Sequence, residues 1–221
     1  MPRDLFTREI TQLQDEVLVL GSMAEKAIQD AMAALSDGDM RWSQKLVEDD
    51  QRINAKRFEI EEQAIFIIGS QQPMASDLRS LVSALFITTD LERIADHAEG
   101  IARINMLLGD EPLPRRLGYI PAMADRAIAM LRDSLKAYID HDTALATRVC
   151  EADDEVDRLQ DSVYEECFKG MVADPSTIQR NTYMLWTSHN LERIADRCTN
   201  IAERVIYLVT GQMEEINVSK Y

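Results

Sequence analysis

Apolar residues recur at spacings of three and four along most of the chain, which is the pattern of an amphipathic helix with one buried face. Turn-forming residues interrupt this pattern in five clusters, at 36–39, 69–77, 109–121, 140–142 and 173–177. The runs between them are about 25 to 35 residues long, contain almost no Gly or Pro, and nowhere alternate as a strand would. The sequence therefore predicts an all-α fold of six long helices.

The third and sixth predicted helices carry the same hexapeptide. LERIAD occupies 91–96 and again 191–196, which is 191 − 91 = 100 positions later. The second and fifth helices align at an offset of 103, which pairs Asp50 with Asp153 and Ile53 with Val156. Such self-similarity indicates that one structural unit was duplicated.

The richest turn lies in the middle of the chain. The segment 109–121 holds three of the six prolines and separates three helices from three helices. Asp142 and Ser176 are predicted N-caps in the second set, because short polar side chains there can accept a backbone hydrogen bond. We expect two tandem antiparallel three-helix bundles, a first repeat over 1–110 and a second over 119–212.

Charge narrows the classes of partner. The 39 acidic residues outnumber the 24 basic ones by 15, a surplus that would repel nucleic acid and anionic lipid. No stretch approaches the roughly 20 apolar residues of a membrane span, and the charged N-terminus does not resemble a secretory signal. The three cysteines, Cys150, Cys167 and Cys198, have no CxxC spacing, which favours reduced, buried thiols in a cytoplasmic protein.

The duplicated hexapeptide places two carboxylates on one helical stripe in each half. Glu92 and Asp96, like Glu192 and Asp196, are four residues apart and lie roughly 150° from the centre of the apolar arc. We therefore expect both pairs to face solvent, where the mutual repulsion of each pair costs only a few tenths of a kcal/mol. Neighbouring surface positions differ between the halves, so the retained acids indicate either solvated charges or a cation site.

A cation site would need ligands from a second helix. Carboxylate oxygens suit hard cations such as Mg²⁺, Ca²⁺ and Mn²⁺, or iron in a non-haem site. The middle helices offer Asp50 in the first half and Asp153 with Asp157 in the second, beside their apolar rows. The pattern is less specific than HExxH or an EF-hand loop, and the three histidines occupy unmatched positions, so we expect them to be structural or solvent-facing.

The two long segments 77–102 and 182–205, each preceded by a D-x-x-[IV]-[ND] motif at 50–54 and 153–157, resemble the PhoU family of bacterial phosphate regulators. The resemblance covers essentially the whole chain. It implies an all-helical cytoplasmic protein that represses phosphate uptake when phosphate is plentiful. It also implies action between the ATPase subunit of the phosphate ABC transporter and a phosphate-sensing histidine kinase, usually as a homodimer.

The resemblance also implies surface metal clusters on E/DxxxD motifs, with iron, zinc or magnesium as the possible metal. Those motifs correspond to Glu92 with Asp96 and to Glu192 with Asp196, with Asp50, Asp153 and Asp157 as neighbouring ligands. The family often has Asn eight positions after the Glu, which Asn200 retains and Gly100 does not. Asn54 stands where a carboxylate would serve a metal better, so we expect the first-half site to be the weaker one.

Three functions remain open from the sequence. A regulatory adaptor without catalysis leads, because the chain has no nucleophile-and-base set, Gly-rich phosphate loop or basic pocket. The alternative is a carboxylate-bridged metalloprotein or helical-bundle metalloenzyme, a chemistry that normally uses Glu-x-x-His pairs inside the bundle. The third is a structural scaffold whose acidic stripes dock basic patches of a partner.

Overall fold

The computed structural model describes residues 2–109 and 118–213. These residues form six long helices, one short 3₁₀ turn and no strand, which confirms the predicted all-α class. Most of the expected linker, 110–117, lies outside the described residues. In chain order the elements are α1 (Pro2–Asp37), α2 (Met40–Gln71), α3 (Ser76–Leu108), α4 (Tyr119–Asp140), α5 (Thr143–Ala173), η1 (Pro175–Thr177) and α6 (Ile178–Thr210).

The N-terminal caps of α2 and α5 are equivalent in the two halves of the chain. Asp39 before α2 and Asp142 before α5 each accept a hydrogen bond of 2.9 Å from a backbone N–H three residues on, and they stand 142 − 39 = 103 positions apart. The predicted N-cap at Asp142 is confirmed, whereas the one at Ser176 is wrong. Ser176 lies inside η1, because Asp174 caps that turn by accepting the Ser176 N–H at 3.0 Å, and Thr177 precedes α6.

Each half buries an apolar core among its three helices. Leu91 and Ile94 of α3 and their equivalents Leu191 and Ile194 of α6 are fully buried. α3 packs against α1 and α2, while α6 packs against α4 and α5. Both sets are antiparallel three-helix bundles, as the periodicity predicts.

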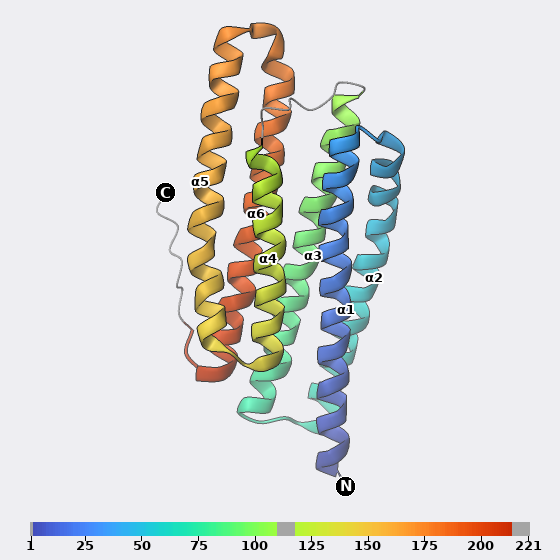
Figure 1. The fold of residues 1–221 in the computed structure, drawn as a ribbon. Helices are drawn as coiled ribbons and strands as arrows, with labels where there is room; N and C mark the ends of the chain where they lie inside the picture. The colour runs from blue at the N-terminus through green and yellow to red at the C-terminus, as the bar shows by residue number, and fades with distance from the viewer. Residues whose placement is uncertain (1, 110–117, 214–221) are drawn as a thin grey trace.

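The two bundles join through α3 and α6, which run antiparallel side by side in the middle of the molecule (Figure 1). α2 and α5 lie at the outer edges, and α1 packs against α4 on one side of the central pair. α2, α3, α6 and α5 therefore form a row of four helices. No helix in the described part of the chain is long and apolar enough to cross a membrane.

Equivalent residues meet reciprocally where α3 and α6 pack. Asp90 on α3 accepts hydrogen bonds from Arg197 at 3.5 Å and from Asn200 at 3.4 Å. Asn190, which occupies the position of Asp90 in the second copy, pairs at 3.1 Å with His97, which occupies the position of Arg197. A contact of position i with j, mirrored by j with i, is the signature of a two-fold related interface. The duplicated bundles thus pack as a dimer within one chain.

Of the two polar contacts between α3 and α6, we expect that of Asp90 to contribute more to stability than that of Asn190. Its replacement by alanine leaves Arg197 and Asn200 without their acceptor, and we expect this to lower the free energy of unfolding by about 1 to 2 kcal/mol in urea denaturation. Asp90→Asn should cost less than half as much, because Asn190 already serves at the equivalent position. An Asp90→Asn variant as unstable as Asp90→Ala would contradict this account.

Candidate functional site

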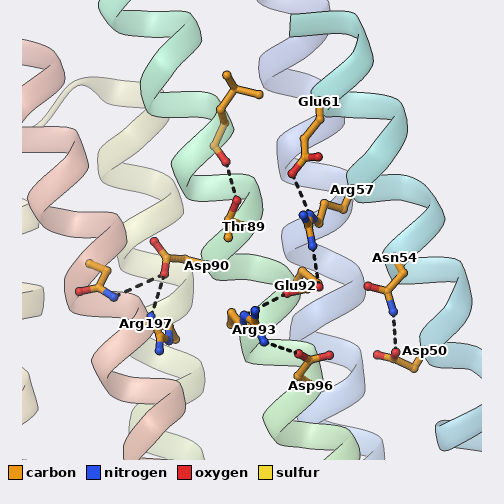
Figure 2. A network of polar contacts seen from close by, with 12 residues as sticks. Asp50, Asn54, Arg57, Glu61, Thr89, Asp90, Glu92, Arg93, Asp96 and Arg197 are labelled. Carbon is orange, nitrogen blue, oxygen red and sulfur yellow. Dashed lines mark hydrogen bonds and ion pairs between the residues drawn. The ribbon is translucent and has the colours of Figure 1, made fainter. Parts of the chain in front are cut away.

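In the first bundle, an arginine of α2 forms an ion pair with a glutamate of the repeated hexapeptide on α3. We call Asp50, Glu92 and Asp96, in the groove between α2 and α3, the first cluster. Arg57 donates from Nη1 to Glu92 Oε1 and from Nε to Glu61 Oε1, each at 2.7 Å (Figure 2). The Glu92 side chain is thereby held by a charged partner from the neighbouring helix.

The other members of the first cluster lie just along the groove. Arg93 forms an ion pair from Nε to Glu92 Oε2 at 3.5 Å and donates from Nη1 to Asp96 Oδ2 at 3.3 Å. Asp50 accepts a hydrogen bond of 2.8 Å from the Asn54 amide. Burial, followed by the negative charge of Asp96, raises the pKa of Asp50 to about 6. The structure therefore brings Asp50 of α2 close to the acids of α3.

The second cluster comprises Asp153 and Asp157 of α5 with Glu192 and Asp196 of α6. Burial, followed by the charge of Asp157, raises the pKa of Asp153 to about 7. Burial, followed by the charge of Asp196, raises the pKa of Glu192 to about 7. Each group feels acids on the opposite helix, so the residues that the sequence suggested as neighbours do lie near one another.

The two clusters differ in how their charge is compensated. Gln160 occupies the position of Arg57 in the second bundle, since 160 − 57 = 103, and it carries no charge. Asp196 accepts a hydrogen bond from Arg193 at 2.8 Å, and Glu192 lies 3.3 Å from Nδ1 of His189. The second cluster thus has no arginine from its middle helix at the position that neutralises Glu92 in the first.

The expectation that both acid pairs of the repeated hexapeptide face solvent is wrong for Glu92, and Asp153 on the neighbouring helix is also buried. Glu92 is only 6% exposed and Asp153 only 5%, while the other five candidates are partly buried. α3 packs against α1, α2 and α6, and α6 packs against α3, α4 and α5. A stripe opposite the apolar arc therefore lies in a groove with the adjacent helix. The two clusters also differ, because Arg57 pairs with a carboxylate of the first cluster only.

In neither cluster do the carboxylate side chains point to a common centre where a metal ion could bind. Among the side chains that the structure describes, in residues 6–109 and 118–213, no three His, Cys, Asp or Glu are placed so that they could hold one metal ion. The donors of the second cluster nevertheless suit a hard divalent cation, since all are carboxylates in one groove and their charges repel. Binding would require rotation of these side chains toward a common point.

Sequence reasoning missed two residues beside the acids. His189 approaches Glu192, and the signal was available, because positions three apart on a helix are neighbours. Arg57 reaches Glu92 from 35 positions earlier in the chain, and nothing local predicts that contact. These two residues account for much of the difference between the clusters.

Fold and site together define an all-α protein of two duplicated three-helix bundles, with carboxylate clusters in the grooves between the middle and last helix of each. The model of the PhoU domain matches the chain twice, over residues 17–104 and 120–205. The chain belongs to the PhoU family.

Relatives and solved structures agree over nearly the full length. A protein of Clostridium acetobutylicum, named phosphate-specific transport system accessory protein PhoU homolog, is 38% identical over 98% of this chain and 100% of its own. A crystal structure of PhoU from Pseudomonas aeruginosa is 36% identical, covers 94% of this chain and 100% of that one, and has a TM-score of 0.87. A crystal structure of the phosphate transport system regulatory protein PhoU from Streptococcus pneumoniae is 29% identical. It covers 95% of this chain and 99% of that one, with a TM-score of 0.88.

Proposed function

We propose that this protein is a non-catalytic adaptor that represses phosphate uptake and phosphate-starvation signalling when phosphate is plentiful. It acts in the cytoplasm between the ATPase subunit of a phosphate ABC transporter and a phosphate-sensing histidine kinase. The observation that carries the proposal is the full-length similarity to relatives named accessory proteins of phosphate-specific transport. The protein functions as a homodimer, which light scattering tests directly.

Phosphate is sensed by the partners rather than bound by this chain. The net charge of −15 opposes binding of a phosphate anion, and the sequence carries no Gly-rich phosphate loop. An adaptor of this kind binds one conformational state of the transporter more tightly and so shifts the equilibrium of the kinase. Calorimetric titration with phosphate should reveal no micromolar affinity, and a micromolar dissociation constant would overturn this part of the proposal.

The adaptor proposal is tested with purified partners and with a deletion strain. The protein should retain both the transporter ATPase subunit and the kinase on an affinity resin. Deletion of its gene should leave phosphate uptake high in phosphate-rich medium, and reintroduction of the wild-type chain should restore repression. Failure to retain either partner, together with normal repression in the deletion strain, would refute the adaptor function.

We propose further that the second cluster binds a divalent cation and that the first does so more weakly. An arginine of the last helix pairs with the Asp of the hexapeptide in both clusters, but only the first also has Arg57 on Glu92, whereas the second groove has Gln160 at that position. Burial, followed by repulsion between the carboxylates, raises the pKa values of Asp153 and Glu192, and a bound cation would offset both effects. Iron, zinc and magnesium are the candidates, and the ion would neutralise the groove without taking part in a reaction.

Removal of two ligands should sharply lower the amount of metal that the second cluster retains. After dialysis against each metal, elemental analysis should find an ion in the wild type that chelator removes. Glu192→Gln with Asp196→Asn should lose most of it, because two of the four carboxylate donors are gone. Asp161→Asn with Glu165→Gln removes the same charge from exposed positions of α5 and is the matched control. Equal metal content in the two double variants would contradict the site.

The alternative, a carboxylate-bridged metalloenzyme, gains no support from the described helices. Such sites project ligands into a bundle core. Here the core of each bundle is apolar, and the candidate acids lie in grooves between helices. Oxygen consumption by the iron-loaded protein would revive this alternative.

A further inference from the structure

The first bundle contains a cleft that borders the first cluster at Asp50 and that the adaptor function does not explain. It lies between α1, α2 and α3 and has a volume of about 220 Å³. Its walls are apolar and are built from Met23, Ala27, Leu46, Ile53, Ala95 and Ala98. Two of the three alanines come from α3, and their small side chains contribute little volume to the space between the helices.

The mouth of the cleft is acidic. Asp30, Asp49, Asp50 and Glu99 line it with only two basic residues, Lys26 and Arg52. Lys26 pairs with Asp30 at 2.8 Å, Arg52 lies 3.8 Å from Asp49, and Glu99 is paired with an arginine of α3 at 2.6 Å.

Asp50 differs from the other acids of the mouth. Its partner is the uncharged amide of Asn54, at 2.8 Å. In the described part of the chain, no basic side chain lies within ion-pair distance of Asp50. The mouth therefore offers one carboxylate to a cation from outside, directly beside an apolar wall.

At two alanine positions of the cleft wall, the second bundle has larger side chains. At the offsets of 103 and 100, Met130 stands at the position of Ala27 and Cys198 at that of Ala98. Met130 is 2% exposed and Cys198 fully buried. The equivalents of Met23 and Arg52, Arg126 and Glu155, form an ion pair of 2.9 Å. The second copy thus has larger side chains at two alanine positions of the wall, and the smaller Val149 and Val156 at the positions of Leu46 and Ile53.

We propose that this cleft binds a small organic cation, a primary alkylammonium, with its chain against the alanine wall and its ammonium at Asp50. Apolar walls favour the carbon chain by removing it from water, and the charge-assisted hydrogen bond to a carboxylate fixes the other end. A metal ion suits the apolar interior of this cleft poorly, because hard cations require several oxygen ligands and three of the four carboxylates at the mouth are already paired with basic side chains.

The test uses protein labelled with carbon-13 in its methionine methyl groups and a titration with hexylammonium in chelator-containing buffer. The Met23 signal should shift with saturation, while that of Met130 in the second bundle stays fixed. Hexanol, which has the same chain without the charge, should shift Met23 much less. An equal response to hexanol would overturn the assignment of a cation site.

Ala27→Met places the methionine of the second copy in the cleft wall and should weaken hexylammonium binding by about tenfold or more. Ala122→Met on α4 is its matched control, because it adds the same side chain to a partly buried alanine outside the cleft. If Ala27→Met does not fold, Asp50→Asn should produce a similar loss relative to Asp154→Asn, an exposed acid of α5. Undiminished binding in the folded variants would overturn the proposal.

A final comparison distinguishes the source of the ammonium group. A lysine peptide that occupies the cleft at least about tenfold more tightly than hexylammonium would overturn the assignment to a free amine in favour of a partner's side chain. Equal or weaker binding of the peptide supports the free amine. Neither outcome depends on the transporter or kinase, so failure here leaves the adaptor function standing.

Discussion

Lowering the pH from 8 to 5.5 should raise the free energy of unfolding of the metal-free protein by roughly 2 to 3 kcal/mol. The pKa values of Asp153 and Glu192 are raised to about 7, from 3.8 and 4.5, chiefly by burial. The folded state therefore binds protons more tightly than the unfolded state. The stability gained by protonation is present at pH 5.5 and is lost as the pH rises through 7. Urea denaturation across this range measures the effect.

An isosteric variant separates these two groups from the general acidity of the chain. Asp153→Asn with Glu192→Gln keeps the shapes but removes both titrations, so its stability should vary much less between pH 5.5 and 8. Asp161→Asn with Glu165→Gln lowers the net charge equally at exposed sites and should keep the wild-type slope. Asp50, with a pKa raised to about 6, leaves a residual dependence. An unchanged slope in the first variant would refute the account.

Exchanging the residues at positions 57 and 160 should exchange the charge compensation of the two clusters, and with it their effects on stability and metal retention. Arg57→Gln, which installs the residue of the second copy, should lower the free energy of unfolding at pH 8 by about 2 to 3 kcal/mol. Breaking a buried pair costs about 3 to 5 kcal/mol, and the cost here is lower because Arg93 also reaches Glu92. The Glu92 side chain, only 9% exposed, would keep one ion pair at 3.5 Å in place of two.

The reverse change, Gln160→Arg, should place a guanidinium beside Glu192 and flatten the pH dependence of stability. It should also lower metal retention by the second cluster, whereas Arg57→Gln should increase retention by the first. Gln51→Arg, an exposed position of α2, controls for the added charge. The claim that positions 57 and 160 set the difference between the clusters would be refuted if Gln160→Arg retained as much metal as the wild type and Arg57→Gln were as stable as the wild type.

Much of the fold follows from features that act over a few residues. The three-and-four spacing of apolar residues predicted all six helices, and the cap at Asp142 was visible in the sequence because capping involves a backbone group only three residues away. The repeated LERIAD predicted the duplication. It also predicted which residues of α2 and α5 would lie near the acids, since the middle and last helices of a bundle must be neighbours.

Tertiary structure decided how the acids are used. One helix in isolation has a single buried face, and on that basis Glu92 should have met water. In the molecule, α3 packs on three sides, so Glu92 enters a groove and meets Arg57, 35 positions away. The reciprocal contacts of Asp90 and Asn190 likewise required the two bundles to pack against each other. Local periodicity thus determined the helices and their duplication. Only the partners that long-range packing brings together made two identical hexapeptides into unequal sites.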